Sequence, residues 1–216
     1  MISEINTFLF DFDGTILDSR KAIVNVFYEL FQKYGDRQLT YEMVDQQFGI
    51  SFRSILAGLD SHKQAEIVRE YFELLPEEEE RSARLFPGMK ENIFYLKNEG
   101  FNVALVTNKE KILVMRSLKK FEIFDLFDVI VTLDDVEKPK PEAEPIELAL
   151  RSMKAQKGKS VMIGDSVFDV EAAKNAGIMS CVIDWQNNYP PKGTLPDFLF
   201  ENINDLMIKF AKYKAI

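Results

Sequence analysis

The amino-acid sequence predicts an α/β fold: a parallel sheet with helices on both faces, into which a helical segment is inserted. Two observations support this prediction. Through most of the chain, short apolar runs of strand length alternate with amphipathic segments of helical period. The stretch 17–84 is the exception, because it shows only helical patterning and is too long for an ordinary crossover connection between strands.

Five apolar runs are expected to form the strands of the sheet. They lie at residues 8–12, 103–106, 129–131, 161–163 and 181–183. The segments between them have a helical period, as at 89–99, where Gly100 supplies a common stop signal, and at 145–153. Sheets of this type bind their ligands beyond the carboxyl ends of the strands. Functional residues are therefore expected directly after the apolar runs.

The stretch 17–84 is expected to form a helical cap inserted between the first two strands, with helices at 22–34, 41–48 and 64–75. Residues 1–16 and 85–216 would then form the core. The insert is either a lid that closes over a site or a helical extension packed rigidly on the core. Sequence patterning does not separate these two alternatives.

Composition excludes several classes of partner. The formal charge of −8 argues against nucleic acid, which requires basic surface. The one cysteine, Cys181, lies in an apolar run and is expected to be a buried, inert thiol, in keeping with a reduced cytoplasm. No apolar segment has membrane-spanning length and no signal peptide is evident, so a soluble cytoplasmic protein is expected. The 18 phenylalanines fit a monomer or a homodimer equally well.

Two carboxylates end the first strand, Asp11 and Asp13, and Gly14 and Thr15 follow them. Residues two apart share one side of a strand as long as the extended geometry persists. Two acids placed in this way repel each other and are costly to desolvate, which a fold tolerates mainly where a cation or a reaction requires it. The alternative is an ordinary turn, in which Asp and Gly are common.

Polar groups also follow the second and third strands. Thr107 and Asn108 offer a hydroxyl, an amide and backbone N–H groups that can hold phosphate oxygens, although the same residues often cap helices. Lys138 and Lys140 are each followed by a proline, so a rigid loop holds both lysines. A lysine there suits the neutralisation of a phosphoryl group, and a solvent-facing basic loop is the alternative.

The fourth strand runs into Asp165, Ser166 and Asp169. Ser166 and Asp169 have the spacing of a helix cap, which is one interpretation. In the other, Asp165 and Asp169 join the two acids of the first strand at one edge of the sheet. Carboxylates that converge in this way need a cation, and hard oxygen ligands favour Mg²⁺.

In these motifs the sequence resembles the haloacid dehalogenase superfamily of phosphohydrolases, whose core is a Rossmann-like sheet. The family signature is an Asp-x-Asp-Gly-Thr loop, a Thr or Ser after the second strand, a Lys and a late Gly-Asp-x-x-x-Asp. The corresponding residues are 11–15, Thr107, Lys140 and 164–169, so the resemblance spans essentially the whole chain. Lys138 matches the family's Lys-Pro-x-Pro pattern directly, but the spacing to the next helix favours Lys140.

The resemblance implies a role for each matching position. Asp11 would attack phosphorus to form an aspartyl-phosphate, and Asp13 would protonate the leaving oxygen and then activate water. The implied ligands of Mg²⁺ are Asp11, Asp13 through its backbone carbonyl, Asp165 and Asp169, the last as ligand or support. The implied substrate-binding residues are Gly14, Thr107, Asn108 and Lys140.

The insert narrows the expected substrate to a small phosphorylated metabolite. A cap after the first motif resembles that of phosphoglycolate phosphatases, sugar-phosphate phosphatases and β-phosphoglucomutases. The segment 131–137 resembles the family's inorganic pyrophosphatases, as does the cap loop 48–53. Arg53 in that loop would meet a second anionic group of the substrate, or else is a surface residue. Phosphoglycolate and pyrophosphate are the favoured substrates.

Particular residues disfavour the alternatives to a phosphohydrolase. The mutases carry a histidine where this chain has Ile23, which disfavours a phosphotransferase of that kind. A non-catalytic phosphate-binding module would be expected to have lost Asp11, Asp13 or Lys140, and all three are present. Dehalogenases lack the second acid, so Asp13 disfavours that activity as well.

Overall fold

The computed structural model of the 216-residue chain describes residues 5–34, 39–50, 52–57, 61–186, 189 and 194–211, without the side chain of Arg53. Contacts between Cα atoms divide the chain into two compact units. Unit 1 comprises Met1–Ile16 and Leu85–Ile216, and unit 2 comprises Leu17–Arg84. A two-stranded sheet of β2 (Leu17–Asp18) and β3 (Arg84–Leu85) lies at the two ends of unit 2.

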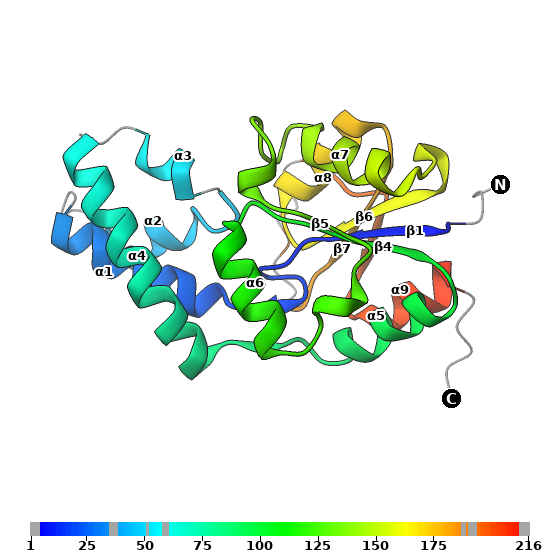
Figure 1. Ribbon diagram of the computed structural model, residues 1–216, viewed down its shortest axis with the longest axis horizontal. Helices are drawn as coiled ribbons and strands as arrows, with labels where there is room; N and C mark the ends of the chain where they lie inside the picture. The colour runs from blue at the N-terminus through cyan, green and yellow to red at the C-terminus, as the bar shows by residue number, and fades with distance from the viewer. Residues whose placement is uncertain are drawn as a thin grey trace. The chain divides into compact units, whose positions relative to one another are not determined.

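Unit 1 is built on a six-stranded sheet with the strand order β5-β4-β1-β6-β7-β8, in which every neighbouring pair is parallel (Figure 1). The strands are β1 (Thr7–Phe10), β4 (Asn102–Val106), β5 (Val129–Val131), β6 (Ser160–Gly164), β7 (Met179–Ile183) and β8 (Phe198–Phe200). Phe10 at the end of β1 lies opposite Leu105 and Ile163, so the carboxyl ends of three adjacent strands meet at one edge. The expected α/β fold is confirmed.

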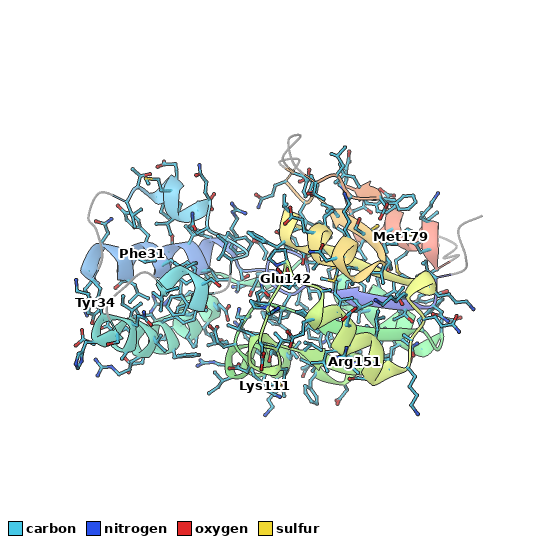
Figure 2. All side chains as sticks on the ribbon, turned by 90° about the horizontal axis from the view of Figure 1, so that it is seen from above. Phe31, Tyr34, Lys111, Glu142, Arg151 and Met179 are labelled. Atoms are coloured by element: carbon cyan, nitrogen blue, oxygen red, sulfur yellow. The ribbon has the colours of Figure 1, made fainter. Side chains whose placement is uncertain are left out.

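Helices cover both faces of this sheet, α7 and α8 on one side and α5 and α9 on the other (Figure 1). The helices of unit 1 are α5 (Met89–Asn98), α6 (Lys111–Lys120), α7 (Glu144–Met153), α8 (Val167–Ala176) and α9 (Ile203–Phe210), with short 3₁₀ turns at Phe124–Leu126, Leu133–Asp135 and Lys157–Lys159. Charged side chains such as Lys111 on α6 and Arg151 on α7 lie on the surface (Figure 2). The sequence patterns predicted neither β8 nor α9.

Unit 2 is helical, with α1 (Arg20–Tyr34), α2 (Tyr41–Asp45), α3 (Phe52–Leu56) and α4 (Ser61–Ser82). Its core is aromatic, since the ring of Phe52 stacks on Phe27 at 5.1 Å and on Tyr71 at 3.9 Å between centroids. Helix α4 extends beyond the expected 64–75 because it continues through Pro76. Proline lacks the N–H that a helix interior uses, yet this helix continues past it.

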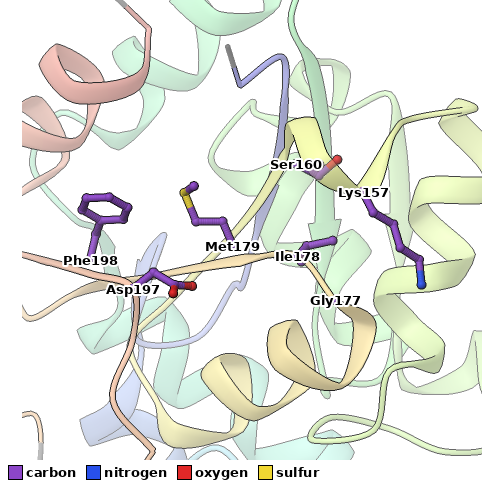
Figure 3. Close-up of a pocket in the computed structure, with 8 residues that line it drawn as sticks. Lys157, Ser160, Gly177, Ile178, Met179, Asp197 and Phe198 are labelled. Atoms are coloured by element: carbon purple, nitrogen blue, oxygen red, sulfur yellow. The ribbon is translucent and has the colours of Figure 1, made fainter. Parts of the chain in front are cut away.

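A pocket of about 450 Å³ lies at the amino-terminal edge of the sheet, lined by the first residues of β6, β7 and β8 (Figure 3). Its charged groups have partners. The carboxylate of Asp197 accepts hydrogen bonds from the backbone N–H and hydroxyl of Ser180, at 2.8 and 2.9 Å. Lys157 pairs with Glu147 at 3.0 Å. The pocket is therefore at the edge opposite the end of β1, and its charges are already compensated.

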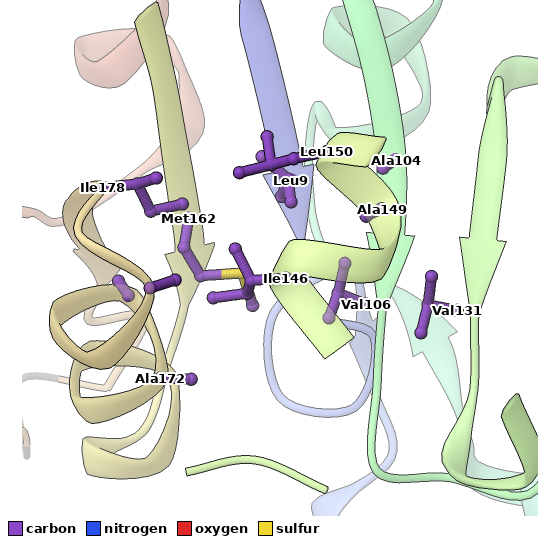
Figure 4. Close-up of a cluster of buried hydrophobic side chains, with 12 residues drawn as sticks. Leu9, Ala104, Val106, Val131, Ile146, Ala149, Leu150, Met162, Ala172 and Ile178 are labelled. Carbon is purple, nitrogen blue, oxygen red and sulfur yellow. The ribbon is translucent and has the colours of Figure 1, made fainter. Parts of the chain in front are cut away.

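The core beneath α7 and α8 fixes the central strands. Leu9 of β1 and Met162 of β6 are fully buried there against Ile146 and Ala149 of α7 and Ala172 of α8 (Figure 4). Phe8 and Phe10, whose side chains point to the other face of the sheet, are also fully buried. A strand that is apolar on both faces is typical of the middle of a parallel sheet. Its carboxyl end, where Asp11 follows, is thus held in place from both sides.

Candidate active site

The loop after β1 leaves the sheet abruptly. The backbone N–H of Asp11 donates to the carbonyl of Ile163 at 2.8 Å, which continues the strand pairing by one residue. The chain then turns, because the N–H groups of Thr15 and Ile16 both donate to the carbonyl of Phe12. The first strand is therefore shorter than the expected 8–12, and the two acids of the loop contact different partners.

Three carboxylates gather at this edge. One oxygen each of Asp11, Asp165 and Asp169 lies within 4.8 Å of the others. Burial raises the pKa of Asp11 to about 7, and the charge of Asp169 adds to this effect. Burial and the neighbouring acids also raise the pKa of Asp165 well above its ordinary range. Asp11 and Asp169 are buried and Asp165 is half-buried. A set of oxygen donors that repel one another in this way fits a hard divalent cation such as Mg²⁺.

Lys140 lies between two of these acids. Its Nζ is 2.8 Å from Oδ1 of Asp11 and 2.6 Å from Oδ1 of Asp169, and its side chain is 2% exposed. Burial alone would lower the pKa of Lys140, but the two carboxylates raise it above its ordinary value, so the ammonium group is charged. Lys138, the alternative lysine of this loop, is exposed. Of the two, Lys140 is the one that reaches the carboxylate cluster.

Asp169 forms the helix cap that the sequence allowed. Its Oδ2 accepts hydrogen bonds from the backbone N–H and the hydroxyl of Ser166, at 3.2 and 2.5 Å, at the start of α8. Its Oδ1 contacts Lys140. One buried carboxylate, 1% exposed, therefore fixes both the helix start and the lysine.

Two glycines allow the chain to approach the acids closely. Gly14 has a φ of +84°, and a Cβ atom there would lie 2.3 Å from Oδ2 of Asp165. A Cβ atom on Gly164 would lie 2.2 Å from the carboxyl carbon of Asp169. The hydroxyl of Thr15 also donates to Asp165 at 3.1 Å. Side chains at either glycine position would displace the carboxylates of the cluster.

The residues after β4 reach the same edge of the sheet. Thr107 is 4% exposed, and its hydroxyl oxygen accepts the backbone N–H of Lys109 at 3.2 Å. The side-chain amide of Asn108 donates to the carbonyl of Lys140 and accepts its N–H, both at 2.9 Å. Thr107, Asn108 and Lys140 thus lie at one edge of the sheet, with the Asn108 side chain bonded to the main chain of Lys140.

Asp13 lies outside the cluster of three carboxylates. Its Oδ1 is 2.8 Å from Nζ of Lys109, whose side chain is 2% exposed. Lys109 was not among the site residues expected from the sequence. Its position directly after Thr107 and Asn108 was the one feature of the sequence that could have indicated it. Arg53 belongs to α3 of unit 2, and its side chain lies outside the described residues.

The arrangement of these loops at one edge of a parallel sheet agrees with the family to which the chain is similar in sequence. The chain belongs to the haloacid dehalogenase-like hydrolase family, whose pattern it matches over residues 8–183, which confirms the resemblance. Pyrophosphatase PpaX of Halalkalibacterium halodurans is 33% identical to this chain over 207 residues, 94% of the chain and 96% of the relative. Pyrophosphatase PpaX of Bacillus anthracis is 30% identical, over 95% of the chain and 96% of the relative.

Solved structures show the same fold. A protein described as a predicted phosphoglycolate phosphatase, from Haemophilus somnus, superposes with a TM-score of 0.79 at 21% identity, covering 97% of this chain and 99% of its own. A HAD phosphatase from Thermococcus onnurineus gives 0.71 at 23% identity, covering 98% and 100%. Within the described ranges, none of the helices combines the length and the apolar character needed to cross a bilayer.

Proposed function

We propose that this hydrolase releases phosphate from a small phosphorylated metabolite, with inorganic pyrophosphate or phosphoglycolate as the favoured substrate, through an aspartyl-phosphate on Asp11. Residues 1–16 and 85–216 form its catalytic core, and 17–84 form a cap over the substrate. The observation that carries the proposal is the position of Lys140, whose Nζ lies within 2.8 Å of both Asp11 and Asp169 beside a third carboxylate.

In the first step a carboxylate oxygen of Asp11 attacks phosphorus, and the bond to the leaving oxygen breaks. The electron pair of that bond goes to the leaving oxygen, which takes a proton from Asp13. Lys140, the hydroxyl of Thr107 and the backbone N–H of Asn108 stabilise the negative charge of the transferring phosphoryl group. The buried position of Asp11 supports this role, since little water surrounds its carboxylate.

In the second step Asp13 removes a proton from a water molecule that attacks the phosphorus of the aspartyl-phosphate. The bond between phosphorus and Asp11 breaks, and the carboxylate and inorganic phosphate are released. Asp165, Asp169, Asp11 and the backbone carbonyl of Asp13 would hold Mg²⁺. When bound, the ion supplies positive charge against the carboxylates and the phosphoryl oxygens.

Pyrophosphate is favoured by the two relatives named pyrophosphatase PpaX, which are 30–33% identical over nearly the whole chain. Phosphoglycolate is the second candidate, on the resemblance of the cap position. In either case Arg53 of the cap would bind the second anionic group of the substrate. A mutase is not favoured, because the position of its characteristic histidine is occupied by Ile23, a buried residue of α1.

The test is phosphate release with Mg²⁺ from pyrophosphate, phosphoglycolate, several sugar phosphates and p-nitrophenyl phosphate. Asp11→Asn is measured beside the wild type, and Asp125→Asn, an exposed acid on the surface, is the matched control. We expect one preferred substrate, at least about a thousandfold loss in Asp11→Asn, and wild-type rates in the control. Phosphate transfer to a second sugar phosphate without release, or undiminished turnover in Asp11→Asn, would contradict the proposal.

A further inference from the structure

We propose that Lys109 is the positioning residue of Asp13: it holds the carboxyl group that exchanges protons with the leaving group and with water. This inference rests on the proposed function, because it assigns a second lysine to the same reaction. Lys140 contacts the acid proposed to attack phosphorus, and Lys109 contacts the acid proposed to transfer protons. The two acids of the first loop would thus each have their own buried lysine.

The contact between Lys109 and Asp13 is buried on the lysine side. Nζ of Lys109 is 2.8 Å from Oδ1 of Asp13, and the two side chains are 2% and 15% exposed. The ammonium group also lies 5.5 Å from the centre of the Phe12 ring. A buried charge needs a partner of opposite sign. The pair therefore holds the position of the Asp13 carboxylate more strongly than an exposed ion pair would.

The main chain of Lys109 is fixed on both sides. Its N–H donates to the hydroxyl of Thr107 at 3.2 Å, and its carbonyl accepts the N–H of Leu133 at 3.1 Å. Lys109 follows β4 and Asp13 follows β1, and these two strands are adjacent and parallel. The lysine is therefore anchored beside the sheet. Its ammonium group contacts the carboxylate of Asp13 in the loop after β1, so Lys109 helps to orient Asp13.

This orientation matters for proton transfer. A general acid must lie within hydrogen-bonding distance of the oxygen that it protonates, and a displaced carboxyl group loses most of its contribution. Protonation is needed most when the leaving group is a poor one, such as an alkoxide. A nitrophenolate ion leaves without a proton. Loss of Lys109 should therefore affect substrates according to their leaving group.

The experiment compares kcat/KM for an alkyl phosphate and for p-nitrophenyl phosphate, with Mg²⁺, in wild type, Lys109→Met and Lys109→Arg. This ratio reports the steps up to the transfer of the phosphoryl group to Asp11. We expect Lys109→Met to lose on the order of a hundredfold with the alkyl ester, the usual scale of general acid catalysis, and about threefold or less with the aryl ester. Lys109→Arg should restore most of the alkyl activity, since it keeps a buried cation.

Lys111→Met is the matched control, because Lys111 lies two residues further on, with a side chain 55% exposed. Lys111→Met should leave kcat/KM unchanged for both the alkyl and the aryl ester. Thermal unfolding of each variant checks the fold, and Lys109→Gln replaces the methionine variant if that one does not fold. An equal loss with both esters, or no loss with either, would overturn the inference and leave the proposed function intact. A wild type that is inactive on pyrophosphate as well as on both esters would instead contradict the proposed function and the inference with it. If the wild type turns over pyrophosphate alone, Lys109→Met must lose that activity and Lys109→Arg must keep most of it, or the inference fails.

Discussion

The side-chain amide of Asn108 and the main chain of Lys140 form a reciprocal pair of hydrogen bonds, each 2.9 Å long. This pair joins the loop after β4 to the loop that carries the buried lysine, much as two strands are joined in a sheet. A side chain selected from the sequence as a phosphate ligand is thus bonded to the residue that reaches Asp11 and Asp169. We infer that the Asn108 amide acts on phosphate through Lys140.

A double-mutant cycle tests this relationship between Asn108 and Lys140. Binding of inorganic phosphate is measured by calorimetry with Mg²⁺ in the two alanine variants and in the double variant. Asn108→Ala should weaken binding about tenfold, equivalent to about 1.4 kcal/mol, because Lys140 then loses the two bonds that fix its main chain. In the Lys140→Ala background the same change should have little further effect. Additive losses would mean that the Asn108 side chain contacts phosphate independently.

Gly14 and Gly100 form a matched pair for testing the close approach to Asp165. Both have a left-handed φ, +84° and +80°, so an alanine is strained at either position. A Cβ atom on Gly14 would lie 2.3 Å from Asp165, whereas one on Gly100 meets nothing within 4 Å. Gly100→Ala should cost about 1 kcal/mol of stability and keep full activity. Gly14→Ala should cost more and also weaken activation by Mg²⁺ at least about tenfold, since the carboxylate must shift.

The outcome of this pair is read from urea unfolding and from the Mg²⁺ dependence of phosphate release. Equal effects of the two alanine substitutions on both quantities would show that backbone strain alone requires Gly14. Such a result would also mean that the carboxylate of Asp165 tolerates a side chain on the neighbouring loop.

Glu110 gives a prediction for pH dependence. It is 8% exposed at the residue before α6, and burial raises its pKa from 4.5 to about 7, although Lys109 acts in the opposite direction. Between these two values the folded chain binds a proton that the unfolded chain has lost. The stabilisation is therefore fully present below pH 4.5 and is lost as the pH rises through 7.

Urea unfolding of wild type and Glu110→Gln at pH 5 and pH 8 measures this effect. The glutamine does not titrate, so the difference between the two proteins isolates Glu110 from the other buried acids. The wild type should lose on the order of 2–3 kcal/mol relative to the variant between the two pH values. A difference that stays constant over this range would mean that Glu110 is ionised in the folded chain throughout.

Trp185 contacts the two segments of unit 1 that adjoin unit 2 in the sequence, the one that ends at Ile16 and the one that begins at Leu85. Its ring stacks on Phe86 at 4.6 Å between centroids, and its Nε1–H donates to the carbonyl of Thr15 at 3.2 Å. Trp185→Phe keeps a stacked ring and loses the hydrogen bond, so it should destabilise by about 1 kcal/mol. Trp185→Ala loses both and should cost about 3 kcal/mol. Equal losses in urea unfolding would contradict a role for the stacked ring.

The sequence predicted five of the six strands, β1, β4, β5, β6 and β7, because their apolar runs are bounded by clear helical periods. The sequence patterns did not identify the edge strand Phe198–Phe200 or α9. Strand length is not the reason, because β5 is also three residues long and was predicted. In the site, the spacing of motifs identified the acids and selected Lys140 over Lys138. Strand order brings the loops together, and that order depends on packing between distant segments. The partner of Asp13 therefore became visible only in the structure, because its lysine follows another strand.

The central claim is that Asp11 carries the phosphoryl group, and trapping that acyl phosphate tests it most directly. The chain is mixed with its preferred substrate and Mg²⁺, quenched in acid and treated with borohydride, which reduces an acyl phosphate to an alcohol. Mass spectrometry then locates the reduced side chain. We predict reduction at residue 11 in the wild type and none in Asp11→Asn. Release of phosphate with an unmodified Asp11, or with the reduced side chain at Asp13, would contradict this claim.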